Sequence, residues 1–255
     1  MRKYTISIFV FLMTLLLASC GRESGVLDKS RTYEIPSEIH SLDIRLNAAD
    51  FEIVHADKFS VESNLKKLSV YEKNGVLTIV DEAKKTISYT DAKLKLYVPK
   101  DIVFEEVDIV TGAANLTADS LSANSLELTL GAGNVEFKCL NAFSDIDIEG
   151  GAGKITIADG TLNDLELKMG VGEFNLTAAL LGNSDLEFGV GESNITLLGS
   201  EEDYTLRIEK GIGSITVDGN DVTTFESNGN RDNYVEIEGG VGAINLNFQE
   251  LAMTL

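Results

Sequence analysis

The sequence predicts an all-β protein built as a parallel β-solenoid, right-handed and β-helix-like, with 19–20 residues per coil and an N-terminal β cap. The first indication is a pattern that recurs along the chain: two alternating apolar residues, a Gly-x-Gly corner and two more alternating apolar residues. The second is its spacing, because the corners from Gly112 to Gly211 follow at steps of 19, 20, 19, 19 and 22 residues. The third is that no helical periodicity occurs after the first twenty or so residues.

The chemistry of one repeat explains the predicted coil. Period-two alternation puts Leu165, Leu167 and Phe174 on one side of the backbone and Glu166 on the other. The corner glycines permit positive φ and let one corner approach the next without a Cβ clash. One copy cannot bury its apolar side alone, so we expect coils stacked about 4.8 Å apart. The predicted corner glycines are Gly131, Gly133, Gly151, Gly153, Gly170, Gly172, Gly189, Gly191, Gly211, Gly213, Gly240 and Gly242, with degenerate corners at Gly112 and Asn47.

The N-terminal segment is similar to a bacterial lipoprotein signal peptide. Two basic residues precede a short apolar run that ends in Leu17-Ala18-Ser19-Cys20, which resembles a lipobox. The run is shorter than the roughly 20 residues that span a bilayer. We therefore expect residues 1–19 to be a signal peptide, Cys20 to be lipidated, and residues 20–32 to be a flexible tether.

An N-terminal β-rich cap with the first coils is expected over residues 33–100, because a solenoid needs its first coil covered. Within it, Asn74-Gly75 is typical of a hairpin turn. The surrounding stretch 68–79 also matches the coil template, so a capping hairpin and an irregular coil both remain open.

The solenoid repeats are expected over residues 101–255. One interval breaks the period, since 29 residues separate Gly211 from Gly240. The excess is the polar segment Asp218–Asn233, which we interpret as a loop because of its Gly and Asn content. Extra loops on repeat scaffolds often bind, so this loop is a candidate contact site.

Charge is distributed unevenly along the chain. Residues 58–100 carry nine Lys against five acidic residues, whereas residues 101–255 carry six basic and 28 acidic residues, a formal charge of −22. So acidic a body excludes nucleic acid as a partner, because phosphate recognition requires the opposite sign. It also favours a soluble monomer.

Cysteine and histidine do not indicate a metal site. Cys139 lies in a strand-like stretch and is expected to be a small core residue. His40 and His55 lie far from any Cys or Asp-rich motif with ligand spacing. No cofactor is expected.

An acidic column is expected on the outer surface, because the position four residues before each corner is acidic in seven of eight copies. The acidic column is Asp43, Asp108, Glu127, Asp147, Glu166, Asp185, Arg207 and Glu236. Like charges on adjacent strands repel, which favours a solvated surface that discourages edge pairing. Loose binding of cations is the alternative, and the weak candidate metal ladder is Asp108, Glu127, Asp147, Glu166 and Asp185.

A second outer column, the polar column, lies five residues after the first corner position. It consists of Glu52, Thr117, Glu136, Thr156, Asn175, Asn194, Thr216 and Asn245. Asn and Thr ladders stabilise stacked strands, so a structural role is expected for this column.

A glycan-active enzyme is the less favoured class, and no catalytic residues are assigned. The solenoid region has six scattered basic residues, no Trp, and Tyr204 and Tyr234 as its only tyrosines, so sugar-stacking platforms are scarce. Glycosidases need two carboxylates at a defined separation, and short uniform coils offer no long loops to form a cleft.

The repeats carry a resemblance to a known family. The strands within Leu42–Ile53, the strand Leu94–Pro99 and the repeated Gly-x-Gly coils resemble the bacterial putative-adhesin family of β-strand-repeat lipoproteins. The resemblance covers nearly all of residues 33–249. It implies a right-handed β-helix-like fold at the cell envelope. The family is largely a domain of unknown function, so it implies no functional residues.

The function expected from these observations is a non-enzymatic, lipid-anchored scaffold, adhesion or binding module on the extracytoplasmic side of a bacterial membrane. An extracytoplasmic role in envelope-stress sensing or regulation is the alternative. The expected partners are the membrane, through the lipid anchor, and an envelope protein or glycan.

Overall fold

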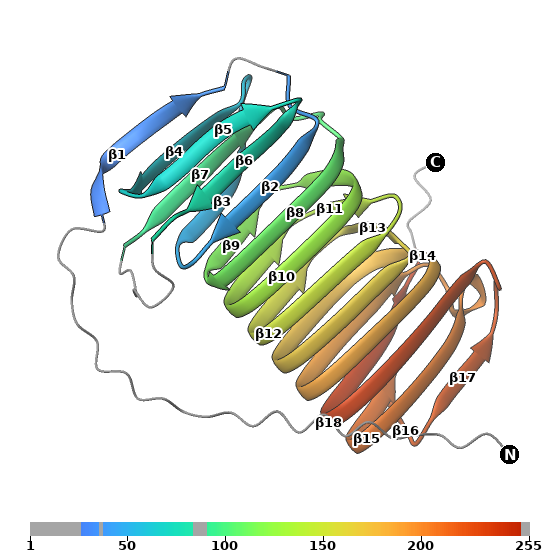
Figure 1. Cartoon of the computed structure of the whole chain (residues 1–255). Helices are drawn as coiled ribbons and strands as arrows, with labels where there is room; N and C mark the ends of the chain where they lie inside the picture. The colour runs from blue at the N-terminus through green and yellow to red at the C-terminus, as the bar shows by residue number, and fades with distance from the viewer. Residues whose placement is uncertain (1–26, 36–37, 84–90, 251–255) are drawn as a thin grey trace, which may run out of the picture.

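The computed structural model describes residues 27–35, 38–83 and 91–250, which form one elongated stack of β-coils (Figure 1). The N-terminal strands are β1 (Leu27–Glu34), β2 (Ser41–Leu46), β3 (Asp50–His55), β4 (Ser60–Leu65), β5 (Leu68–Lys73), β6 (Val76–Asp81) and β7 (Lys93–Val98). The central strands are β8 (Phe104–Ala113), β9 (Asn115–Ala118), β10 (Leu121–Phe137), β11 (Leu140–Ala142), β12 (Ile146–Ile157), β13 (Gly160–Asn163) and β14 (Leu165–Leu198). The C-terminal elements are the 3-10 turn η1 (Glu201–Asp203) and the strands β15 (Thr205–Val217), β16 (Asn220–Val222), β17 (Phe225–Asn228) and β18 (Asn233–Gln249).

Each central coil contains three strand segments. Each segment pairs in parallel with the equivalent segment of the next coil, which gives three rows of parallel pairing along the stack. Strand β10 pairs with β12 in parallel along both sides of the glycine corner, from Leu126 opposite Ile146 to Phe137 opposite Ile157. The third row joins the start of β10 to β11 and β11 to β13. The prediction of an all-β parallel solenoid is therefore confirmed.

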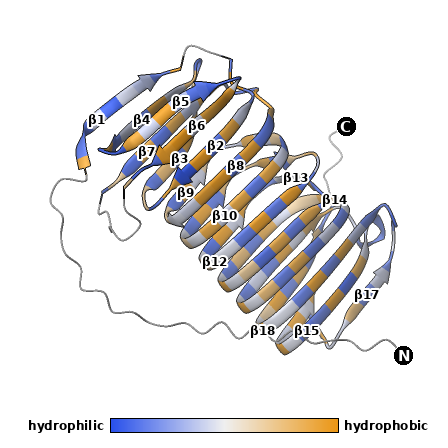
Figure 2. Ribbon diagram, viewed as in Figure 1, coloured by the Kyte–Doolittle hydropathy of each residue, from blue (hydrophilic) through white to orange (hydrophobic). Residues whose placement is uncertain are grey.

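The core lies inside the coils and follows the period-two alternation along each strand. Figure 2 shows this alternation as hydrophobic and hydrophilic bands along the coils. Phe51, Phe137 and Phe174 are fully buried, as are the aliphatic residues on the same inward positions. Burying one such side chain contributes about 1.5–3 kcal/mol, so the stack is held together mainly by its continuous apolar interior.

At the C-terminal end, the order of coils in the stack differs from the order in the chain. Strand β18 pairs in parallel with the second half of β14 on one side and with β15 on the other. The last coil in sequence is therefore inserted between the two coils that precede it, and β15 becomes the outermost coil.

The segment Asp218–Asn233, predicted as a loop, is corrected by the structure. It contains β16 and β17, which pair antiparallel with the outer edge of β15. The extra residues are needed because the chain must cover that edge before it returns to form β18.

The N-terminal end is built in the same way. Strands β2 and β3 form a coil inserted between β6–β7 and β8–β9. The outermost coil is covered by antiparallel strands, β5 on β6 and β4 on β7. The open question over residues 68–79 is thereby answered as a hairpin, with Asn74 and Gly75 at φ values of 53° and 76° in its turn.

The tether predicted over residues 20–32 is also corrected. Residues Leu27–Glu34 form β1, which pairs antiparallel with β4. The polar side chains of this strand hid its character, because an edge strand that is exposed on both faces has no apolar alternation. The predicted signal peptide, residues 1–19, and Cys20 lie outside the described residues.

Candidate functional site

The Gly-x-Gly corners form one edge of the stack and set the geometry of the surfaces beside it. Gly153 has a φ of +135°, and a Cβ atom built there would lie 1.9 Å from the carbonyl oxygen of Gly133. A Cβ atom on Gly151, the first glycine of that corner, would lie 2.4 Å from the carbonyl oxygen of Gly131. Both corner positions therefore require glycine, because the backbones of successive coils approach too closely for any side chain.

The structure places the acidic column as register neighbours on one outer face. Glu127 lies between Asp108 and Asp147, and Asp147 lies next to Glu166. Further along the stack Asp185 pairs with Glu236 because β18 is inserted beside β14. Five of these residues are the weak candidate metal ladder, yet among the described residues no group of three or more His, Cys, Asp or Glu side chains could hold a metal ion.

Three basic side chains neutralise parts of this acidic face. Near the N-terminal end, Arg45 contacts Asp108 at 2.6 Å and Asp43 at 3.0 Å. Near the C-terminal end, Arg207 contacts Glu236 at 2.9 Å and Glu209 at 2.5 Å. In the middle, Lys168 forms an ion pair with Glu166.

Two carboxylates of the acidic column, Asp147 and Asp185, have raised pKa values. Burial raises the pKa of Asp147 above its ordinary value, and the carboxylates of Glu166 and Glu149 raise that pKa further. Burial likewise raises the pKa of Asp185, with Glu236 and Glu166 adding to it. The face therefore carries negative charge that repels itself and attracts cations.

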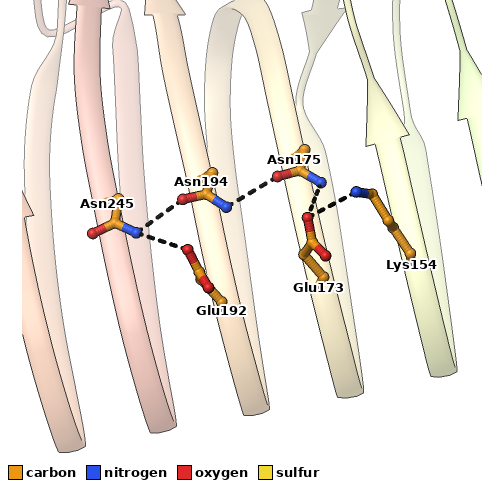
Figure 3. Close-up of polar contacts among 6 residues, drawn as sticks. All are labelled: Lys154, Glu173, Asn175, Glu192, Asn194 and Asn245. Carbon is orange, nitrogen blue, oxygen red and sulfur yellow. Dashed lines mark hydrogen bonds and ion pairs between the residues drawn. The ribbon is translucent and has the colours of Figure 1, made fainter.

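The polar column behaves differently, because side chains in its C-terminal half bond to one another along the stack (Figure 3). Asn194 donates to the side-chain oxygen of Asn175 at 3.0 Å, and Asn245 donates to that of Asn194 at 2.8 Å. Thr216 continues the ladder by donating to Asn245 at 2.8 Å. Beside it, Glu173 accepts hydrogen bonds from Asn175 and from Lys154, each at 2.8 Å. This column links successive coils through neutral and paired groups.

Between the acidic face and the corners lies an open groove of about 650 Å³, which we call the corner groove. One wall is formed by the outward residues two positions before each corner: Thr129, Glu149, Lys168, Glu187 and Glu238. The floor consists of corner glycines and of Met169 and Phe188. Burial raises the pKa of Glu238, and the nearby carboxylates of Glu236, Asp185 and Glu187 raise it further.

Sequence reasoning identified the corners and the acidic column but missed the corner groove. The groove combines Glu187 and Glu238, which become register neighbours only because β18 lies beside β14. The available signal was the 29-residue interval between Gly211 and Gly240, which indicated an irregularity without giving the order of the coils.

The remaining singled-out residues do not converge on a site. His40 lies 3.1 Å from Glu105, whereas His55 lies 3.0 Å from the hydroxyl of Ser120. Cys139 is half-buried, and the amide nitrogen of Asn141 lies 3.5 Å from its sulfur. They occupy separate strands and loops of the stack.

Comparison with models of known families identifies the family of this chain. The model of the family described as Toastrack DUF4097 matches residues 33–247, which cover nearly all of the stack. The chain belongs to the Toastrack family. This confirms the resemblance noted from the repeats, and no curated protein matches the chain.

Several solved structures are similar to this Toastrack protein at low sequence identity. A putative adhesin from Bacteroides fragilis is 15% identical, with 85% of this chain and 95% of that chain covered and a TM-score of 0.49. A putative adhesin from Parabacteroides distasonis is 16% identical, with coverage of 89% and 98% and a TM-score of 0.45. A putative lipid binding protein from the same species is 16% identical, with coverage of 86% and 96% and a TM-score of 0.42. Within the described ranges of the Toastrack chain, no helix has the length and apolar character needed to cross a membrane.

Proposed function

We propose that this Toastrack protein is a non-enzymatic, lipid-anchored binding module of the bacterial cell envelope. The observation that carries the proposal is the corner groove, which crosses successive coils of a stack capped at both ends. Three carboxylates on its wall, Glu149, Glu187 and Glu238, form what we call the acidic wall. A surface of this kind suits an elongated partner, because it repeats along one axis.

The anchor rests on the Leu17–Cys20 lipobox and on the short distance from Cys20 to the fold. Only six residues separate Cys20 from Leu27, where β1 begins. Seven residue steps, fully extended, span at most about 25 Å. Lipidation of Cys20 would therefore hold the N-terminal end of the stack close to the membrane surface.

A binding role is favoured over hydrolysis by the arrangement of the carboxylates. The acidic side chains of the corner groove, Glu149, Glu187 and Glu238, all come from one wall. Glycosidases instead need two carboxylates that flank the scissile bond from opposite sides. Carboxylates repeated along one wall attract a cationic partner, but they do not form the facing pair that hydrolysis requires.

The anchor is tested by changing Cys20 to Ala and following detergent-phase partitioning of the full chain expressed in a bacterial host. We expect the wild-type protein in the detergent phase and the variant in the aqueous phase or as an uncleaved precursor. A variant that is processed and still partitions fully into detergent contradicts the anchor.

Binding is tested with the labelled chain from residue 21 onward, which keeps all described residues, added to bacterial envelopes that lack the protein. We expect saturable binding that excess unlabelled protein displaces. Binding that rises linearly without saturation, or that unlabelled protein does not displace, contradicts a binding module.

A further inference from the structure

An apolar ridge runs along the corners beside the corner groove. The middle residues of four successive corners in the C-terminal half of the stack are Val171, Val190, Val241 and Ile212, with exposed fractions of 54%, 50%, 47% and 74%. The equivalent residues toward the N-terminal end are Ala113, Ala132 and Ala152. The apolar ridge is therefore confined to the C-terminal half of the stack. Single exposed apolar residues are ordinary, but a contiguous row of them indicates a contact surface.

The ridge and the corner groove are continuous. A smaller hollow is shared by Phe188, Gly189 and Gly240 of the groove and by Val241 and Ile212 of the ridge. Because the glycines between them carry no side chains, the acidic wall and the ridge form the two sides of one shallow track.

The charge of the wall is unbalanced where the ridge is largest. Glu187 and Glu209 are both register neighbours of Glu238, and Arg207 pairs with Glu209. Glu187 and Glu238 are exposed and lie side by side. Like charges opposite one another on adjacent strands are destabilising, so a cation placed between them relieves repulsion.

We propose that the corner groove and the apolar ridge together bind an extended segment of an envelope protein in which Lys or Arg alternates with apolar residues. Side chains of an extended segment alternate between two sides, so its cations would face the acidic wall and its apolar residues the ridge. The groove crosses five coils, about 19 Å or about six extended residues, and the ridge lies beside three of these coils. This partner class rests on the proposed function and specifies its ligand.

The test uses a fluorescent hexapeptide of alternating Lys and Val, with Lys–Ser and Glu–Val hexapeptides for comparison, and measures anisotropy against the chain from residue 21. We expect saturable binding of the Lys–Val peptide that weakens with added salt, and much weaker binding of the other two. Equal binding of the Lys–Ser peptide would mean attraction by net charge alone and overturn the proposal.

Matched variants locate the site. E149Q/E187Q/E238Q removes the acidic wall and should weaken binding about tenfold. E201Q/E202Q/E226Q makes the same change of charge at exposed positions of the C-terminal end and should leave affinity nearly unchanged. If both triple variants weaken binding equally, the groove is not the site.

The ridge is tested with V190T/V241T/I212T, which keeps branched side chains and removes apolar contact. We expect about tenfold weaker binding, and an unaltered affinity for V103T/F143S, which changes exposed apolar residues elsewhere. Thermal melting by circular dichroism confirms that each variant is folded. If the groove and ridge variants still bind envelopes as the wild type does, the binding function stands and this partner assignment is wrong.

Discussion

The central coils and the two ends of the stack are assembled by different rules. In the centre, β8, β10, β12 and the two halves of β14 follow one another in the stack as they do in the chain. At each end, the coil nearest the chain terminus is inserted one position inward, as β2–β3 and β18 are. The outermost coil is closed by antiparallel strands instead.

The difference shows how a stack of equivalent coils can stop. A terminal coil at the outer edge would leave a row of unpaired backbone groups and a free end that frays. Insertion gives that coil partners on both edges. Short antiparallel strands such as β5 and β16 then cover the exposed edge, because they fold back locally onto the outermost coil.

The largest expected effect tests the close stacking of the central corners. Gly153→Val places a Cβ atom against the carbonyl oxygen of Gly133 at a positive φ, so we expect a loss of about 3 kcal/mol or more in unfolding free energy. Gly219→Val at the C-terminal end is the matched change, because Gly219 also has a positive φ but has no atom near its missing Cβ. It should cost about 1–2 kcal/mol, from the positive φ alone. Urea unfolding measures both, and equal losses would contradict the stacking account.

A smaller effect is expected from removing the C-terminal edge cover. Replacing residues 218–232 with a connection of central-coil length deletes the pairing of β16 and β17 with β15. We expect a loss of about 3 kcal/mol at most and association through the bared edge. Thr223→Ser and Thr224→Ser, exposed between these strands, serve as controls. Unchanged melting and a monomer by light scattering would show that the edge needs no cover.

Two variants of the polar column can be compared, each with an expected loss of about 1 kcal/mol in unfolding free energy. Asn194→Ala removes a side chain that bonds to a neighbour on each side, and we expect a loss of about 1.5 kcal/mol. Thr216→Val, in the outermost coil, removes one donor without changing shape and should cost about half as much. If Thr216→Val costs more, the end coil depends on this column more than the centre does.

The smallest effect concerns the acidic column and pH. Because the pKa values of Asp147 and Asp185 are raised in the folded state, that state binds their protons more tightly than the unfolded chain does. Their contribution to stability therefore increases as pH falls from neutral toward the ordinary carboxyl range. The double change D147N/D185N should stabilise the protein slightly at pH 7, by under about 1 kcal/mol after solvent screening.

The difference between wild type and D147N/D185N should shrink on acidification, and thermal melts across pH measure it. Other carboxylates act in the opposite direction, since Lys138 lowers the pKa of Asp119 and Lys154 lowers that of Glu173. Comparing the two proteins at each pH cancels these contributions. A difference that grows on acidification contradicts the sign.

The local parts of this structure could be predicted from the sequence, and its long-range order could not. Alternation such as Leu126, Leu128 and Leu130 fixes which side chains point inward, and glycines at a constant spacing fix the corners. Which coil pairs with which cannot be predicted from this pattern, because every coil presents the same backbone edge. Nothing in the local pattern makes β18 prefer the edge of β14 over the outer edge of β15.

The same distinction between local pattern and long-range order applies to the candidate site. The acidic column depends only on equal spacing and was predicted, whereas the corner groove depends on Glu238 lying beside Glu187 and was not. The cysteine expected to carry lipid remains a prediction, since it lies outside the described residues. Edge strand β1 was missed because none of its residues is fully buried, so its sequence shows no apolar alternation.

Inserted terminal coils also determine where the molecule can change length in evolution. A repeat added at either chain end would have to separate two coils that already pair with each other along their edges. Duplicating one central repeat, such as residues 146–164, would add one coil and about 4.8 Å without disturbing either end. Length is therefore free to vary from the middle, and the stack can become longer or shorter while both closures stay the same.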